Sequence, residues 1–101
     1  MRILTAAVIL ATAATSTAAF AQARLTDSQF IKAARCSGLA GAEDSRFADL
    51  VKANQRGRAE FVIDKAMNAK DAAARQARRA GEGAKAQIQA ELSGVCAGLG
   101  A

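Results

Sequence analysis

The first 23 residues have the pattern of a cleavable signal peptide, and this pattern sets how much of the chain is left to fold. A short basic start precedes an apolar run from Ile3 to Leu10, and Ala21-Gln22-Ala23 is the kind of small-residue site that signal peptidase cleaves after. We therefore expect Sec-type export to the periplasm or the cell exterior, with cleavage after Ala23. The remainder, residues 24–101, is expected to form a single small domain.

The alternative is an uncleaved membrane anchor, which needs about 20 strongly apolar residues. The stretch from Ile3 to Phe20 instead contains five hydroxyl residues, Thr5, Thr12, Thr15, Ser16 and Thr17. No later segment is apolar enough to span a bilayer, so we expect no transmembrane segment after cleavage.

The composition after Ala23 predicts an all-α protein with a small core. Only 14 of the 78 residues from Arg24 onward are Leu, Ile, Val or Phe, and Pro, His, Trp and Tyr are absent. Alanine, arginine, lysine, glutamine and glutamate are abundant, and these are strong helix formers. The apolar residues recur at helical spacing, and a net charge of +4 is too modest to indicate a disordered chain.

Cys36 and Cys96 are the two cysteines of the chain, and in an exported protein they leave one intramolecular pairing. We expect a structural disulfide that stabilises the fold by about 4 kcal/mol in the chain-entropy model. A redox-active pair would favour Cys-x-x-Cys spacing, which is absent. Intermolecular pairing is the remaining alternative.

The first expected helix has a clear start. Thr26 is a good N-cap and Gln29 completes a capping box three residues later. Gly38 and Gly41 are expected to end this helix. Its apolar face consists of Phe30, Ala33, Ala34 and Ser37.

Three further helices follow from the positions of apolar residues and glycines. The second begins near residue 44 or 45 and either ends at Gly57 or continues through it. The third covers about residues 58–80, and the fourth begins near Ala84.

The last two helices are expected to form a long antiparallel hairpin about Gly81-Glu82-Gly83, because this is the strongest helix breaker in the chain. Phe61, Val62 and Val95 would then gather at the base of the hairpin. Its far end would be a thin arm in which small side chains face the fourth helix, namely Ala66, Ala69, Ala73, Ala77 and Ala80. The sequence thus predicts a bundle of three to four helices with one disulfide.

Residue patterns for catalysis are missing. Without histidine there is no Ser-His-Asp triad, no Cys-His pair and no usual zinc site, and no glycine loop matches a nucleotide fingerprint. The adjacent Glu43 and Asp44 are expected to cap the second helix, and Glu60 and Asp64 to lie on a solvated face. We therefore expect no enzymatic activity, no cofactor and no metal site.

A basic arm is the one feature that points to a partner. It carries a net charge of +3 within 16 residues, and its cations are Lys70, Arg75, Arg78, Arg79 and Lys85. Arginine suits bidentate contacts with phosphate and carboxylate groups, so these residues are a candidate anion-binding site. The alternative is an ordinary solvated face of an alanine-rich helix.

The function predicted from these features is that of a small periplasmic interaction or structural protein. The basic arm would contact an anionic envelope component or an acidic protein. Nucleic acid is not an expected partner, because export separates the chain from it and the arm lacks aromatic residues for stacking. An alanine-rich stripe could also serve a homodimer.

The alternative function is a periplasmic stress chaperone. In general plan, a single disulfide, a helical body and a small exported size resemble the acid-stress chaperones of the bacterial periplasm. That resemblance implies an apolar base that becomes exposed at low pH, through the nine carboxylates of the chain.

Overall fold

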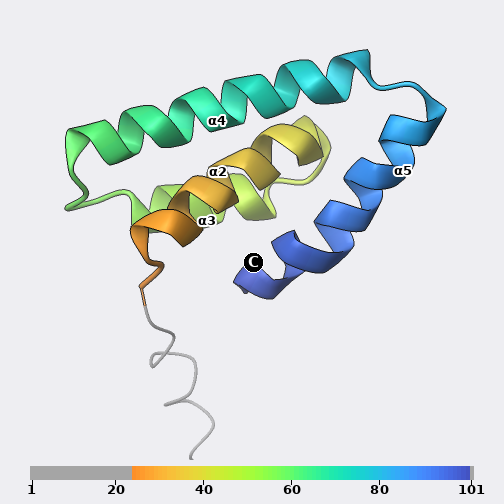
Figure 1. Cartoon of the computed structure of the whole chain (residues 1–101). Helices are drawn as coiled ribbons and strands as arrows, with labels where there is room; N and C mark the ends of the chain where they lie inside the picture. The colour runs from red at the N-terminus through yellow and green to blue at the C-terminus, as the bar shows by residue number, and fades with distance from the viewer. Residues whose placement is uncertain (1–23, 101) are drawn as a thin grey trace, which may run out of the picture.

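The computed structural model describes residues 24–100, which form four α-helices and no strand. In chain order the helices are α2 (Asp27–Ala40), α3 (Arg46–Asn54), α4 (Glu60–Arg79) and α5 (Glu82–Glu91) (Figure 1). A 3-10 turn, Gly41–Glu43, joins α2 to α3. After α5 come a π turn, η2 (Leu92–Cys96), and a 3-10 turn, η3 (Ala97–Leu99). The predicted signal peptide and its cleavage site lie outside the described residues.

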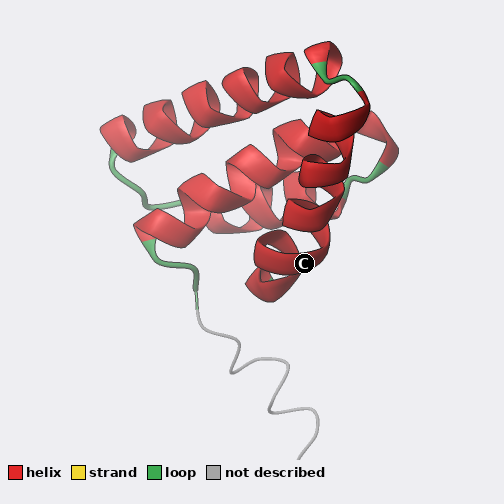
Figure 2. Ribbon diagram, turned by 45° about the vertical axis from the view of Figure 1, so that its right-hand side comes forward, coloured by secondary structure: helices red, strands yellow, loops and turns green. Residues whose placement is uncertain are grey.

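The predicted fold class is confirmed. The described part of the chain is an all-α bundle with one disulfide, and α4 and α5 form a C-terminal pair joined by a short turn (Figure 2). The break falls at Ala80 and Gly81, so α5 begins two residues earlier than predicted and Gly83 lies inside it. None of the helices between residues 24 and 100 combines the length and the apolar character that a membrane span requires.

The helix α2 lies at the centre of the bundle, and α3, α4 and η2 all pack against it. Near its start, Phe30 clusters with Val62 and Ala66 of α4. Near its end, Leu39 clusters with Ala73 of α4. The two helices therefore run side by side in the same direction, as Figure 1 shows.

A glycine allows this close packing. A Cβ atom added at Gly38 would overlap the backbone oxygen of Lys70 and would lie 2.9 Å from the Cβ of Ala73. The expectation that Gly38 helps to end the first helix is wrong, because α2 continues to Ala40. Gly41 ends it, with the positive φ of 74° that favours glycine.

The start of α2 has the predicted capping box. The hydroxyl oxygen of Thr26 accepts a hydrogen bond from the backbone N–H of Gln29 at 3.1 Å. The Gln29 side chain in turn accepts one from the backbone N–H of Thr26 at 2.9 Å. Two backbone donors that the helix itself cannot satisfy are thereby paired.

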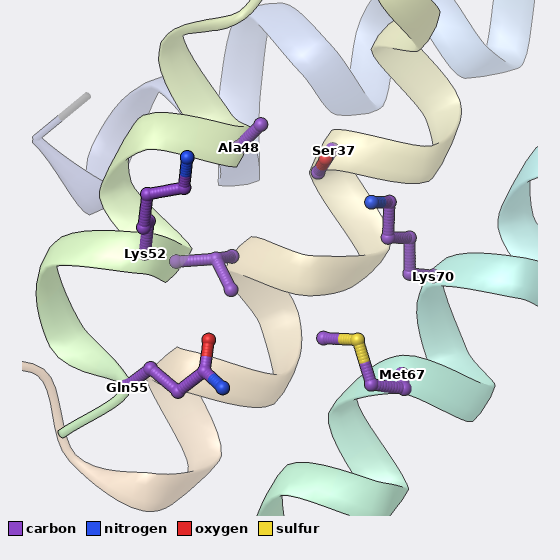
Figure 3. A pocket seen from close by; sticks show the side chains of 7 residues that line it. Ser37, Ala48, Lys52, Gln55, Met67 and Lys70 are labelled. Atoms are coloured by element: carbon purple, nitrogen blue, oxygen red, sulfur yellow. The ribbon is translucent and has the colours of Figure 1, made fainter.

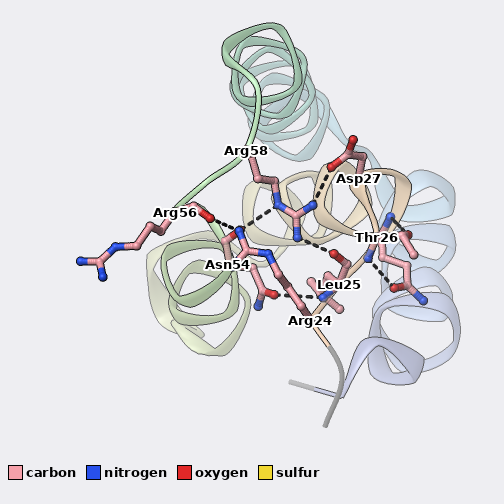
Figure 4. A network of polar contacts seen from close by, with 8 residues as sticks. Arg24, Leu25, Thr26, Asp27, Asn54, Arg56 and Arg58 are labelled. Carbon is pink, nitrogen blue, oxygen red and sulfur yellow. Dashed lines mark hydrogen bonds and ion pairs between the residues drawn. The ribbon is translucent and has the colours of Figure 1, made fainter.

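Arg58 ties the loop between α3 and α4 to the start of α2 (Figure 4). Its side chain is only 5% exposed and forms an ion pair with Asp27 at 2.6 Å. It also donates to the carbonyl oxygens of Asn54, at 2.7 Å, and of Leu25. Its guanidinium carbon lies 4.6 Å from the centre of the Phe30 ring, a cation–π geometry.

The second and third helices are separate, so the alternative of one helix through Gly57 is wrong. Ser45 precedes α3, close to the predicted start, and Asp44 accepts a hydrogen bond from the backbone N–H of Arg46 at 3.1 Å. The helix ends at Asn54, and Gly57 lies in the following turn with a φ of 83°.

The disulfide Cys36–Cys96 is confirmed and joins α2 to η2. Its Cα atoms lie 5.9 Å apart, and the two cysteines are 1% and 0% exposed. Both pack with Phe47 of α3 in one buried cluster. The bond therefore fastens the C-terminal segment to the central helix inside the core.

The alanines of α4 pack mainly on α2, and not on the following helix as predicted. Ala66 and Ala73 are fully buried in clusters that include apolar residues of α2. Farther along, Ala77 and Ala80 contact the cluster that contains Ile88 of α5. Part of the thin arm expected from the sequence is therefore covered by α2.

Two large apolar residues that were predicted to pack at the base of the hairpin are exposed instead. Phe61 is 68% exposed and Val95 is 52% exposed. Val95 leaves the stripe because a π turn holds more than four residues, so a step of four from Leu92 reaches the buried Cys96 instead. Phe61 faces solvent because the adjacent Val62 occupies the side of α4 that is covered.

Replacing both cysteines with alanine should lower the free energy of unfolding by about 4 kcal/mol, because the unfolded chain regains the freedom of an open loop. The loop in question spans 60 residues. Urea denaturation followed by circular dichroism measures the difference between the oxidised protein and Cys36→Ala/Cys96→Ala. An equal stability of the two proteins would contradict a structural role for the bond.

Gly38→Ala should lower the free energy of unfolding by about 1–3 kcal/mol, because the added methyl group forces α2 and α4 apart. Gly83→Ala is the matched control, since a Cβ there meets no atom within 4 Å. Removing that exposed helical glycine should stabilise the protein by about 0.5–1 kcal/mol. Thermal and urea unfolding of both variants give the comparison, and similar effects would refute the close contact.

Candidate functional site

The five cations of the predicted basic arm do not form one surface in the structure. Lys70, Arg75, Arg78 and Arg79 lie on α4, and Lys85 lies on α5. All five side chains are on exposed residues. They do not converge on one hollow: Lys70 borders a groove beside α3, whereas none of the other four lines it.

The three arginines of α4 form one outward face. Arg75 lies three residues before Arg78 and four before Arg79, so the three are neighbours on the helix surface. Each is turned by about 120–160° around the helix axis from the buried Ala73, at 3.6 residues per turn. Within residues 24–100, none of them forms an ion pair, so their guanidinium groups are available to a partner.

Other arginines are engaged within the protein. Arg46 lies 2.7 Å from Asp44 and 5.3 Å from the centre of the Phe47 ring. Hydrogen bonds from its side chain, and then from its backbone N–H, lower the pKa of Asp44. Arg58 is held as described above.

Arg35 and Glu91 form a bidentate ion pair between α2 and α5. Nε of Arg35 lies 2.7 Å from one carboxylate oxygen, and Nη2 lies 3.0 Å from the other. These hydrogen bonds lower the pKa of Glu91 and raise that of Arg35. The pair is a second connection between the C-terminal segment and α2: Arg35 lies one residue before Cys36, and Glu91 lies five residues before Cys96.

A groove between α3 and α4 lies beside Lys70 (Figure 3). It has a volume of about 320 Å³, and Ser37 of α2 contributes to its lining. Lys52 and Gln55 come from α3 and the turn after it, and Met67 and Lys70 come from α4. The groove thus combines two ammonium groups with apolar side chains.

Sequence reasoning missed all of these groove residues except Lys70 as candidate site residues. Lys52, Gln55 and Met67 come from separate segments, and no short motif links them. Ser37 is the one residue that could have indicated a binding site from the sequence. It is a polar residue on the otherwise apolar face of the first helix.

Metal ligands do not cluster in the described residues, where no group of three Cys, Asp or Glu side chains could hold an ion. A second hollow of about 410 Å³ includes Asp44, Arg46 and Ser93 in its lining, and its charged pair is already satisfied internally. The chain matches no protein-family model, no curated protein and no solved structure. The function must therefore be argued from the surfaces of the chain itself.

The contribution of the Arg35–Glu91 pair should depend on pH. Because the folded state lowers the pKa of Glu91, the pair stabilises the protein above the unfolded-state value near 4.3 and loses this effect as the pH falls through the folded value. A double-mutant cycle with Arg35→Gln and Glu91→Gln should give a coupling of about 0.5–1 kcal/mol at neutral pH. Below the folded value the coupling should vanish, because Glu91 is then protonated. A coupling that persists there would contradict the assignment.

Proposed function

We propose that this chain is an exported, non-enzymatic binding protein whose outward face on α4 contacts an anionic component of the cell envelope. The proposal rests on which arginines form ion pairs within the protein and which do not. Arg35, Arg46 and Arg58 are held in ion pairs, whereas Arg75, Arg78 and Arg79 have none within the described residues. Three neighbouring guanidinium groups on one helix face suit a surface of phosphate groups.

The mode of contact is electrostatic. The face lacks large apolar residues: Ala72 lies one turn before Arg75, and only Gln76 and Ala77 lie between Arg75 and Arg78. Burial in the acyl region of a membrane would gain little from such side chains. We therefore expect a peripheral, salt-sensitive association with headgroups, in which each arginine contributes about 1 kcal/mol near an anionic surface.

A disulfide and a buried core support an exported location for this role. Cys36 and Cys96 are bonded and fully enclosed, and such bonds persist in oxidising compartments. The bond also keeps the C-terminal segment against α2, so that a binding face on α4 is presented by a fixed body.

Reversing the three charges with Arg75→Glu/Arg78→Glu/Arg79→Glu should weaken binding to anionic phospholipid vesicles by about 100-fold or more. Co-sedimentation with vesicles of phosphatidylglycerol, compared with phosphatidylcholine, measures this loss. Raising the salt from about 0.1 M to about 1 M should release the original protein, because the screening length falls from about 10 Å to about 3 Å.

The matched control is Lys32→Glu/Arg56→Glu/Lys65→Glu, which changes the net charge equally at three exposed cations elsewhere. It should retain most of the binding. An equal loss in both variants would show that net charge acts, and not this face. Unchanged binding after the α4 reversal would remove the proposal, and binding to an acidic protein but not to vesicles would replace the envelope component with that partner.

A further inference from the structure

A groove runs between α3 and α4, and α2 contributes to its floor. Two adjoining sections of about 320 Å³ and about 290 Å³ share Ser37, Ala48 and Lys70. Together they reach the size of small-molecule sites, which is about 300–1,000 Å³. The groove lies beside Lys70 and apart from the three arginines of α4.

A buried hydroxyl without a partner lies in this groove. Ser37 is only 6% exposed and lines both sections. Ser93 donates to the carbonyl oxygen of Gln89 at 2.7 Å, whereas the Ser37 side chain makes no hydrogen bond within residues 24–100. Leaving a buried polar group unpaired is unfavourable, so a ligand atom that bonds this hydroxyl would bind more tightly.

The walls of the groove are positively charged. Lys52 stands on α3, Lys70 stands on α4, and neither forms an ion pair within the described residues. In Figure 3 the ammonium group of Lys70 points toward Ser37, and the amide of Gln55 points into the groove. The residues that line the two sections include no acid, so the charge favours an anion.

The rest of the lining is apolar or small. Val51 and Met67 line the first section, and Gly38, Ala42 and Ala74 line the second. Along α4 the groove extends from Met67 to Ala74, which is about 10 Å at a rise of 1.5 Å per residue. Lys70 lies midway along this distance, so an anionic head beside it leaves apolar or small side chains on either side for an alkyl chain.

We propose that this groove binds a single-chain anionic amphiphile, namely a fatty-acid carboxylate. The carboxylate accepts hydrogen bonds from Lys52, Lys70 and the Ser37 hydroxyl, and the alkyl chain lies over Ala48 and Ala74. A carboxylate offers about four lone-pair sites, enough for these three donors and the Gln55 amide. This site differs from the proposed headgroup-binding face and does not use its arginines.

Titration of the purified, disulfide-bonded protein with decanoate, followed by amide NMR shifts, tests the site directly. Decanoate should shift resonances around Ser37, Lys52 and Lys70. Decanol and decyltrimethylammonium carry the same chain without the negative charge and should bind at least tenfold more weakly. Acetate carries the same head without the chain and should also bind at least tenfold more weakly.

Two pairs of variants locate the head and the chain. Lys52→Gln/Lys70→Gln should weaken decanoate binding by about 100-fold, roughly tenfold for each charged contact, whereas Lys32→Gln/Lys65→Gln should not. Ala74→Leu fills the second section and should abolish binding, whereas Ala72→Leu, at an exposed position on the same helix, should leave it unchanged. Circular dichroism confirms that each variant is folded.

The outcomes separate this proposal from the preceding one. Arg75→Glu/Arg78→Glu/Arg79→Glu should bind decanoate normally even though it loses vesicle binding. The groove proposal is overturned if decanol binds as tightly as decanoate or if Ala74→Leu has no effect. It is also overturned if an acidic peptide shifts the same resonances at lower concentration than decanoate does.

Discussion

The close approach of α2 and α4 is the contact on which the rest of the bundle depends. It exists because Gly38 leaves room for the backbone at Lys70 and because Ala73 adds only a methyl group. A chain with few large apolar residues gains its packing from many short contacts between small side chains. Once α2 and α4 lie together, Phe30 is enclosed by Val62 and Ala66, and α3 covers another side of α2.

The remaining elements are fastened to the same central helix. The disulfide at Cys36 and the ion pair at Arg35 attach the C-terminal segment, and Arg58 attaches the α3–α4 loop. A domain of this size buries only about 60% of its unfolded surface, so such connections make up for a small core. They also hold α4 in a fixed position. The helix carries the arginine face on its outer side, and its inner side borders the groove.

Local signals in the sequence predicted the parts of the structure that depend on near neighbours. Thr26 and Gln29 form the predicted cap, and Cys36 and Cys96 form the disulfide that was expected from two cysteines behind a predicted signal peptide. The candidate site was predicted only in part, because the sequence groups Lys70 with Arg75 by proximity alone. Around a helix, the two point in different directions, so Lys70 borders the groove and Arg75 does not.

The sequence by itself determined the all-α class, the start of the first helix and the disulfide, since helix propensity, capping and cysteine pairing need little knowledge of the tertiary arrangement. Only the tertiary structure decided that α2 covers the alanines of α4, that Gly38 permits this contact, and that Phe61 and Val95 remain exposed. The spacing of the alanines along α4 is the same whether they pack on α2 or on α5. The spacing alone therefore cannot show which helix they contact. Which helix the alanines face depends on how closely two backbones can approach, and here Gly38 allows α2 to come close to α4.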